Sequence, residues 1–448
     1  MNRLTYREIF ALWLPLALSG EMMSISGPVI SAAVSRLPDA TLNLAAYGFL
    51  MSIAVLIESP VIMMLSASVA LVRSRASYLI VRRFVIHLSI VVTSVGLLIY
   101  FTPLYDFLFL GVMGLPSEIA QTARPALQLL IFWPVSIAWR RFFQGILIWQ
   151  GRSALIAYGT ACRLLTMAAT LVVGLIVQTI PGVLLAGLAE GLSVIVEMCI
   201  IAWWARPLIR ERVLPVLNDP PGTVPLNYRR LFRFYLPLAG TDAMRVVSRP
   251  ILTAGIARMP NPTLSLAAWS VAQGLSFLFA SFVMAIQEVV VARAGMRENE
   301  RRLAIFGAIL GVVFSALSAL IVVTPLAHEY FAALLSVPAP VEALAIPVAL
   351  IIFTMPILFA ARNVLRGVLI VRRHTDVVQM AMFANLIALI ILLVIGVYWD
   401  GAAGAVIAAW AVLGAQIFEI VMLRWLWRPR EPIQASELAE PVPVAEDA

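Results

Sequence analysis

The stretch from Tyr6 to Met22 reads YREIFALWLPLALSGEM, and the stretch from Tyr228 to Met244 reads YRRLFRFYLPLAGTDAM. The second begins 222 residues after the first, and the offset continues without a gap: over residues 6–47, 18 of 42 positions are identical to those of the second copy. Leu, Ala and Val match by chance in apolar sequence, but tyrosines, arginines and prolines in one register do not. The chain is therefore one unit that occurs twice.

The repeat continues to the end of each half, at residue types that rarely match by chance. The pairs are Pro103 with Pro325, Pro116 with Pro338, Pro134 with Pro356, Arg140 with Arg362, Gly145 with Gly367, Gly182 with Gly404, Glu197 with Glu419, and Trp203 with Trp425. Because the first apolar stretch has a copy inside the chain, we interpret it as a membrane segment and not as a signal peptide.

The composition excludes an ordinary soluble domain. Of the 448 residues, 62% are hydrophobic and 12% are charged, whereas soluble proteins are about 45–50% apolar and about 25% charged. The apolar residues fall into six segments in each half, and a helix needs about 20 residues to cross the bilayer core. The predicted segments are 8–35, 43–72, 84–110, 117–149, 153–178, 182–205, 230–257, 265–292, 303–331, 339–371, 375–399 and 402–427.

These segments predict an all-α polytopic membrane protein with twelve transmembrane helices. Runs of this length satisfy their backbone hydrogen bonds in lipid as helices and not as barrel strands. We expect an N-lobe at residues 1–205, a proline-rich cytoplasmic linker at 206–227, a C-lobe at 228–428 and a disordered acidic tail at 429–448.

The basic residues predict the orientation. The sequence contains 32 arginines and no lysine, and most of the arginines lie near the N-terminus, in the even-numbered loops between segments and before the tail. By the positive-inside rule, we expect both termini in the cytoplasm. Because each half has an even number of segments, both halves enter the membrane from the same side. We therefore expect two parallel repeats around a central cavity, as in many secondary transporters.

Other classes of function lack their residues in this sequence. His87, His328 and His374 are far apart and without the spacing of a metal site, and Cys162 and Cys199 lie in apolar segments without a disulfide pattern. The arginines form no basic and aromatic stripe of the kind that binds nucleic acid. With no nucleophile beside a base and no phosphate-binding glycine loop, we expect neither an enzyme nor a cofactor, with an intramembrane enzyme as a minor alternative.

Residues that occur in both halves are best explained by the shared fold. Pro15, Pro28, Pro237 and Pro250 lie in the first helix of each half, where proline produces kinks or hinges. Four shared charged residues are expected to be structural for the same reason: Arg140, Arg362, Glu197 and Glu419.

Charged residues that occur in only one half are candidates for a site, because an ionisable group inside a membrane segment often marks a transport pathway. Glu21 and Glu58 lie midway along the first and second segments, where the second half has Ala243 and Ala280. Desolvation and mutual repulsion favour a proton or a cation on such carboxylates, so we expect a coupling-ion site for a proton or sodium. The alternative is an ion pair of either carboxylate with Arg163, which we otherwise expect to bind substrate.

The second half carries Asp242, Arg245 and Arg249 in its first helix. Spacings of three and four residues place them on one helix face. Guanidinium groups bind carboxylate and phosphate oxygens with paired donors, so we expect these residues to bind an anionic substrate; the alternative is a structural pair of Asp242 with Arg245. Gln287 and Glu288 are expected to line an inner vestibule, or to lie at a solvated helix end.

This arrangement resembles the multidrug and toxic compound extrusion (MATE) transporters and their wider superfamily, which also contains lipid-linked oligosaccharide flippases. Within the superfamily, four stretches look closest to the progressive ankylosis (ANK) family. They are Gly20-Glu21, Leu44-Ala45-Ala46-Tyr47-Gly48, Gly145-Ile146-Leu147 and Ser248-Arg249-Pro250-Ile251. The resemblance implies a twelve-helix, two-lobed transporter in the plasma membrane.

The two families imply different substrates. ANK proteins are associated with export of pyrophosphate, nucleotide or citrate-like anions, which suits Arg245 and Arg249. MATE proteins export organic cations, driven by protons or sodium through acidic residues of the first lobe, which suits Glu21. Glu21 and Arg249 lie at matching motif positions, whereas Arg163 and Arg245 are in none of the four stretches.

We therefore expect an ion-coupled secondary transporter that exports small organic anions by alternating access. Its expected partners are membrane lipid and a small organic ion, with no nucleic acid, and we expect a monomer. Three alternatives remain open: a MATE-type exporter of cationic drugs, a lipid-linked saccharide flippase, and a membrane scaffold that transports nothing. The flippase would need a strongly cationic cavity, which two or three arginines do not provide.

Overall fold

The computed structural model describes residues 4–217, 219, 225–294, 297–372, 374–399 and 401–426. Within these residues it is helical and contains no strand, which confirms the predicted all-α class. The predicted tail at 429–448 lies outside the described residues, as does part of the predicted linker.

Each predicted segment of the first half corresponds to a helix or to a pair of helices separated by a short break. The elements are α1 (Tyr6–Ser24), α2 (Ser26–Ser35), α3 (Ala40–Ile62), α4 (Met64–Leu71), α5 (Arg75–Phe101), α6 (Leu104–Asp106), the π-helix η1 (Phe107–Val112), α7 (Ser117–Leu129), the 3-10 helix η2 (Leu130–Phe132), α8 (Trp133–Trp149), α9 (Ala154–Val177), α10 (Gly182–Leu208) and the π-helix η3 (Ile209–Val213). The helix that starts at Gly182 thus continues beyond residue 205, where we expected the linker to begin.

The second half repeats this order. Its elements are α11 (Tyr228–Ala257), α12 (Pro262–Met284), α13 (Ile286–Arg293), α14 (Arg297–Val323), α15 (Leu326–His328), the π-helix η4 (Glu329–Leu334), α16 (Ala339–Ile352), α17 (Met355–Val371), α18 (Thr375–Trp399) and α19 (Gly404–Leu426). The break between α12 and α13 at Ala285 lies 222 residues after the break between α3 and α4 at Met63, so the irregularities repeat along with the helices.

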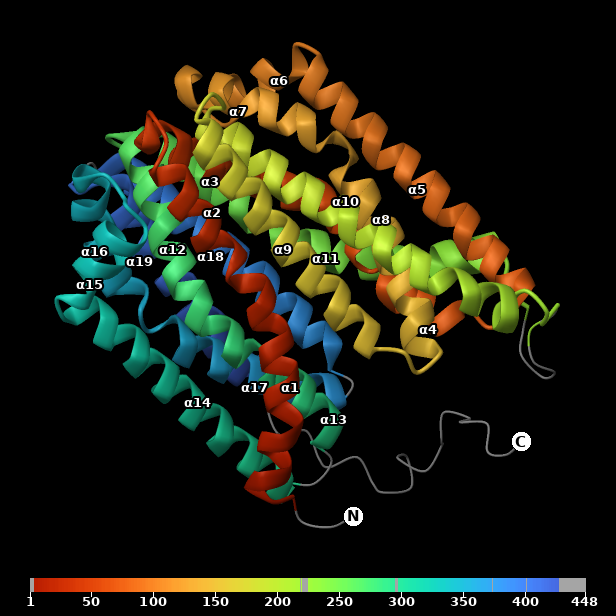
Figure 1. Ribbon diagram of the computed structural model, residues 1–448. Helices are drawn as coiled ribbons and strands as arrows, with labels where there is room; N and C mark the ends of the chain where they lie inside the picture. Colours follow the sequence, from red (N-terminus) through yellow and green to blue (C-terminus); the bar gives the residue numbers. More distant parts are fainter. Residues whose placement is uncertain are drawn as a thin grey trace.

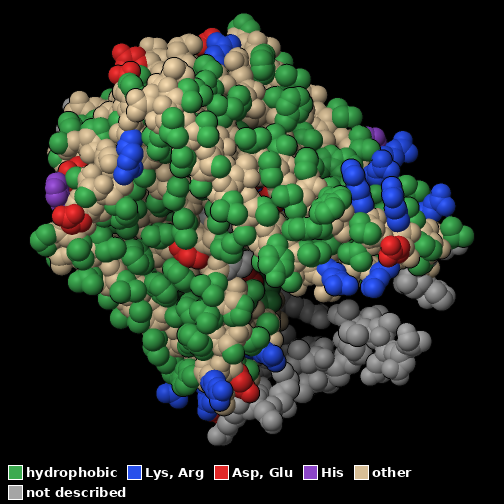
Figure 2. Space-filling view, in the orientation of Figure 1, with side chains coloured by type: hydrophobic (Ala, Val, Ile, Leu, Met, Phe, Trp, Pro, Cys, Tyr) green, Lys and Arg blue, Asp and Glu red, His purple; other side chains and the backbone are tan. Residues whose placement is uncertain are grey.

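Ten of the twelve segments in the described residues are long and apolar enough to cross a membrane by length and composition. The remaining two are the segment α7–η2–α8, in which the 3-10 turn η2 separates helices of 13 and 17 residues, and the helix α11, which carries arginines along its length. Figure 2 shows hydrophobic side chains over most of the visible face, with arginines toward its margins. Large apolar side chains such as Ile90, Val172 and Ile391 are exposed, as expected for a surface whose solvent is lipid.

The helices form two lobes that meet at one end and diverge toward the other (Figure 1). We call the end that carries η1 and η4 the distal end, and the end that carries Thr5 and Tyr228 the proximal end. A single apolar core joins the lobes: it includes Leu44 and Phe49 of α3 together with Leu266 and Leu275 of α12. The lobes are therefore packed together distally around α3 and α12.

The proximal half of α1 packs on the C-lobe and not on its own lobe. Trp13 Nε1 donates a hydrogen bond to the carbonyl oxygen of Phe282 (2.9 Å). The Trp13 ring also packs against Phe306 and Phe314 of α14, and Figure 1 shows α1 beside α13 at this end. The break at Ile25 between α1 and α2 lies three residues before Pro28, whose missing N–H cannot bond to the preceding turn.

The proximal half of α11 crosses to the N-lobe in the same way. The Tyr235 hydroxyl donates to the carbonyl oxygen of Pro60, and its ring packs on Phe84 at 4.8 Å between ring centroids. Tyr228 pairs with His87 through a hydrogen bond of 2.8 Å. Tyr235 and Pro60 are the repeat equivalents of Trp13 and Phe282, so the two lobes exchange their first helices symmetrically.

The four prolines expected to kink or hinge the first helices behave differently in the two halves. Pro15 lies inside α1, and α11 runs without a break through Pro237 and Pro250. A break occurs only near Pro28 among these four. Their role as hinges in a motion stays a prediction.

Two arginines join the lobes at the distal end, and the repeat relates them. Arg36 Nη2 donates to the carbonyl oxygen of Leu334 (2.8 Å), the last residue of η4 in the C-lobe. Arg258 donates to the carbonyl oxygens of Met113 (2.6 Å) and Val112 at the end of η1 in the N-lobe. Carbonyls at a helix end lack partners within the helix and accept such bonds readily. We call these contacts the distal latch.

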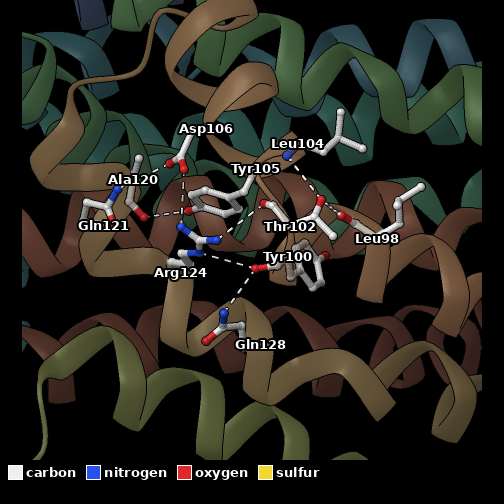
Figure 3. A network of polar contacts seen from close by, with 10 residues as sticks. All are labelled: Leu98, Tyr100, Thr102, Leu104, Tyr105, Asp106, Ala120, Gln121, Arg124 and Gln128. Carbon is white, nitrogen blue, oxygen red and sulfur yellow. Dashed lines mark hydrogen bonds and ion pairs between the residues drawn. The ribbon is translucent and has the colours of Figure 1, made fainter.

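A third distal arginine provides a natural comparison because its contacts stay within the N-lobe. Arg124 lies beside Asp106 (3.5 Å) and over the Tyr105 ring, and it donates to the carbonyl oxygens of Tyr100 and Thr102. Figure 3 shows these residues gathered around the Arg124 guanidinium.

We predict that removing the distal latch separates the distal ends of the lobes. Spin labels at Gly111 and Ala333, which are exposed equivalents on η1 and η4, report this separation by electron–electron resonance. The double variant Arg36→Ala, Arg258→Ala should show a longer or broader distance distribution. The latch bonds have a charged donor and contribute about 1.5–3 kcal/mol each.

The matched control is Arg124→Ala, which removes a distal arginine without touching the latch and should leave the distance distribution unchanged. An unchanged distribution in the double variant would show that the apolar core alone holds the distal ends together.

Candidate functional site

A cavity of about 880 Å³ lies between the lobes, within the range of small-molecule sites. Its walls come from both lobes: Tyr47 and Glu58 of α3 and Arg163 of α9 on one side, and Arg249 of α11 and Gln273 of α12 on the other. The crossed helices α1 and α11 both contribute to the lining.

The lining is rich in charge. Among the described residues, seven arginines and three glutamates border the cavity. They are Arg140, Arg141, Arg163, Arg245, Arg249, Arg362 and Arg366, with Glu58, Glu190 and Glu288. Four of the arginines have a carboxylate partner and three have none, as the following contacts show.

Arg140 is paired with Glu197, and both side chains are buried. Glu197 also accepts hydrogen bonds from Gln144 (3.3 Å) and Thr160 (3.4 Å). Glu197 therefore holds α8, α9 and α10 together. The expected structural role for Glu197 agrees with this packing, but Arg140 also borders the cavity, which we did not expect.

Arg163 is paired with Glu190 of α10 at 3.1 Å, and both side chains are buried. This contact replaces the predicted alternative in which Glu21 or Glu58 pairs with Arg163. The two residues are 27 positions apart on different helices, so helix periodicity did not suggest them.

The stripe on α11 is present as predicted. Asp242 is buried and accepts a hydrogen bond from Arg245 (2.6 Å), which confirms the intrahelical pair that we considered. Arg245 nevertheless keeps 52% of its side chain exposed and borders the cavity. Pairing and substrate contact are therefore compatible at this residue.

In the C-lobe, Arg366 is paired with Glu419, the equivalent of Glu197. Arg362 donates to Gln416 (2.8 Å) and lies over the Phe359 ring at 4.4 Å, but it has no carboxylate partner among the described residues. The repeat thus preserves one arginine–glutamate pair on each side of the cavity.

Arg141 and Arg249 make no side-chain hydrogen bond or ion pair with any described residue. Arg249 is exposed to the cavity. In addition, five arginines of the lining keep a buried Nε without a bonding partner, namely Arg140, Arg141, Arg163, Arg362 and Arg366. Unsatisfied buried donors are rare in proteins and call for a ligand or water.

Glu21 and Glu58, which we expected to share one ion site, have separate surroundings. Glu21 is buried between the lobes and accepts hydrogen bonds from Ser24 (2.7 Å) and Ser281, and it is absent from the cavity lining. Glu58 borders the cavity and has no hydrogen-bond partner among the described side chains. No described contact joins the two carboxylates.

Gln287 and Glu288 border the cavity at the start of α13, where α12 is interrupted at Ala285. Glu288 is exposed and Gln287 is partly so. Neither side chain forms an ion pair in the described part of the chain. Their role in a vestibule stays a prediction, because an exposed helix start also fits the alternative of a solvated helix end.

Sequence reasoning missed Arg141, Glu190 and Arg366. Each lacks a charged equivalent in the other half, where Asn363, Val412 and Gln144 occupy the matching positions. The difference between the two halves that singles out Glu21 and Glu58 also marks these three residues. Arg140 and its repeat equivalent Arg362 were not predicted to line the cavity, because residues that occur in both halves were assigned to the fold alone.

No model of a known protein family matches the sequence, and no curated protein matches it either. Solved structures of one superfamily share the fold. An inward-facing multidrug resistance MATE family transporter of the MOP superfamily is 15% identical and has a TM-score of 0.63, with 92% of this chain and 99% of that chain covered.

Two further structures widen the comparison. The lipid II flippase MurJ in an inward closed conformation is 13% identical with a TM-score of 0.71, covering 92% of this chain and 87% of that chain. A MOP superfamily transporter from Pyrococcus furiosus, described as having a binding pocket of reverse polarity, is 17% identical with a TM-score of 0.61, covering 93% and 94%. The chain therefore has the MATE-like fold; the narrower resemblance to the ANK family finds no support in these comparisons.

We predict that Glu197→Gln strongly destabilises the protein, because it leaves the buried Arg140 without its counter-charge. Loss of one partner of a buried pair costs about 3–5 kcal/mol. Thermal unfolding in detergent should show a lower melting temperature, and adding Arg140→Gln to the same chain should restore part of it.

The control for this cycle is Glu118→Gln at the exposed start of α7, which should leave the melting temperature unchanged. Additive effects of the two substitutions would show that the pair is not coupled.

Proposed function

We propose that the protein is a secondary transporter that carries small organic anions through the central cavity by alternating access. The observation that carries this proposal is the set of cavity arginines without a carboxylate partner: Arg141, Arg249 and Arg362. A guanidinium group that faces a cavity inside a membrane protein is costly unless an anion or water completes its bonds. Carboxylate and phosphate groups fit its paired donors.

The free donors come from both lobes. Arg141 and the buried Nε of Arg140 belong to α8, whereas Arg249 lies on α11 and Arg362 on α17. An anion with two charged ends, such as a dicarboxylate or a diphosphate, can therefore contact both lobes at once. A ligand that bridges two lobes biases the distance between them, which is what alternating access requires.

The fold supports this mechanism. Solved structures with this fold include a MATE family transporter in inward-facing and outward-facing conformations. In the present chain the distal latch closes one end, and the break between each pair of helices α3–α4 and α12–α13 lies beside the cavity. We propose that the proximal end faces the cytoplasm, because most arginines lie there, and that the protein resides in the plasma membrane.

The cavity argues against a MATE-type exporter of cationic drugs for this chain. A cationic drug would meet three guanidinium groups without counter-charges, and like charges in a cavity of low dielectric repel strongly. The description of the Pyrococcus furiosus relative shows that pockets of more than one polarity occur on this fold.

A lipid-linked saccharide flippase is the second candidate. The sequence suggested only two or three cavity arginines, too few for a flippase, but seven line the cavity among the described residues. A lipid-linked diphosphate presents the same anionic chemistry as a soluble one, so the two differ in the tail and not in the head group. A scaffold without transport would leave the unbonded arginine donors unexplained.

Coupling to an ion is also part of the proposal. Glu58 borders the cavity and is the candidate for the coupling proton, while Glu21 links α1 to Ser281 of the opposite lobe and is a candidate for an interlobe switch. The chain needs no partner beyond lipid and substrate for this cycle, and we propose a monomer.

We predict that proteoliposomes containing the protein transport pyrophosphate or citrate, and that the triple variant Arg141→Gln, Arg249→Gln, Arg362→Gln loses at least tenfold of this flux. Each charge-assisted bond contributes about 1.5–3 kcal/mol, so a single arginine already accounts for about tenfold. Radiolabelled uptake measures the flux.

The control is Arg124→Gln, an arginine with no contact to the cavity, which should transport like the wild type. Movement of cationic dyes that the triple substitution leaves unchanged would support the cationic-drug exporter. Transport of a labelled lipid-linked diphosphate without transport of the soluble anions would identify a flippase.

A further inference from the structure

We propose that Glu58 makes binding of the anion and binding of a proton mutually favourable, so that the two cross the membrane in the same direction. The inference rests on the proposed function, since it concerns the same cavity. In this proposal, Glu58 determines whether binding of the proton strengthens or weakens binding of the anion.

Glu58 lies in the wall of the cavity but is 9% exposed, and no described group donates a hydrogen bond to it. By contrast, Glu21 has two serine donors and lies outside the lining. A buried carboxylate without donors is stabilised in its charged form only by nearby positive charge. Glu58 therefore depends on the arginines of the cavity.

Those arginines come from three helices of two lobes. From the N-lobe, the charged groups that share the cavity wall with Glu58 are Arg140 and Arg141 on α8, Arg163 on α9 and the acidic Glu190 on α10. Arg140 and Arg163 are already paired with other carboxylates. Arg141 is the N-lobe guanidinium that Glu58 does not share with a closer carboxylate.

From the opposite lobe, Arg249 on α11 lines the same cavity as Glu58. Tyr47, on the same helix as Glu58, also lines the cavity, and Tyr235 on α11 donates to the carbonyl oxygen of Pro60, within one turn of Glu58. Arg141 and Arg249 are thus the two positive groups that are free to balance the Glu58 carboxylate.

The same two arginines are proposed to bind the substrate. In the empty cavity the ionised Glu58 therefore acts as a tethered anion that partly satisfies them. When a substrate anion enters, two negative groups compete for the same guanidinium groups and repel each other. Protonation of Glu58 removes this repulsion, so the anion binds more tightly to the protonated protein.

Thermodynamic linkage makes the effect reciprocal: a bound anion raises the affinity of Glu58 for a proton by the same factor. The proton reaches the carboxylate from water in the cavity and leaves with the anion at the opposite side. The carrier then alternates between a state in which the anion and the proton are both bound and a state in which neither is bound.

This coupling has a consequence for direction. In a cell that maintains an inward proton gradient, a carrier that moves the proton and the anion together takes the anion up. Export, which we expected from the sequence, would instead require the proton and the anion to exclude each other.

The first experiment measures binding of pyrophosphate to purified protein between about pH 5.5 and pH 8.5, for the wild type and for Glu58→Gln. The protonation of pyrophosphate itself also affects binding. Its effect cancels in the ratio of the two dissociation constants, because both proteins bind the same ligand. We expect the wild type to approach Glu58→Gln at low pH and to bind about tenfold more weakly at high pH, the size given by two charges about 10 Å apart at an effective dielectric constant of about 20.

The control is Glu118→Gln, at an exposed glutamate near the start of α7 that lies outside the cavity lining. Its carboxylate does not face the bound anion, so its substitution should leave the pH dependence as in the wild type. A constant ratio for Glu58→Gln across the pH range would overturn the proposal. The absence of pyrophosphate, citrate or nucleotide binding at every pH would instead contradict the proposed function.

The second experiment uses the wild-type protein alone and so does not depend on the folding of a variant. Proteoliposomes with the membrane potential clamped at zero are placed in acidic medium, and labelled pyrophosphate is followed. Accumulation inside the vesicles supports movement in the same direction as the proton. Acid-driven loss of preloaded pyrophosphate would show exchange and overturn the inference.

Discussion

A guanidinium group inside a membrane-spanning bundle must find a partner, and this requirement organises the centre of the molecule. Four cavity arginines obtain a carboxylate from the chain itself, through Glu197, Glu190, Asp242 and Glu419. Each of these pairs also ties neighbouring helices or turns together. The remaining three arginines face the cavity without such a partner in the described part of the chain, so the same requirement that stabilises the lobes leaves the site prepared for an anion.

The duplicated sequence explains why the protein has two lobes and how the lobes hold each other. Arg36 and Arg258 form equivalent bonds to the ends of η4 and η1, and Trp13 and Tyr235 form equivalent bonds to the breaks after α12 and α3. The lobes therefore hold each other in two symmetric ways. Departures from the symmetry, such as Glu58, Arg141 and Arg249, lie in the cavity between these contacts, where a binding site can differ between the two lobes without disturbing the shared frame.

The sequence alone predicted the helices well, because the 222-residue offset is carried by prolines and arginines as well as by apolar residues. It also predicted the Asp242–Arg245 pair, since that contact depends only on the helix period. It failed where contacts join residues distant in sequence: Arg163 with Glu190, the crossing of Trp13 to the C-lobe, and the separation of Glu21 from Glu58. These depend on how helices pack, which neither spacing nor composition determines.

The central claim is that the unpaired arginines of the cavity bind an anion, and the position of a bound anion tests it most directly. Crystals or cryo-EM samples of the protein prepared with tungstate, an electron-dense oxyanion, would locate the site in a difference map. We expect density between the guanidinium groups of Arg141, Arg249 and Arg362, which disappears on competition with pyrophosphate. Tungstate bound only at the arginine-rich proximal surface, with the cavity free of density, would contradict the account.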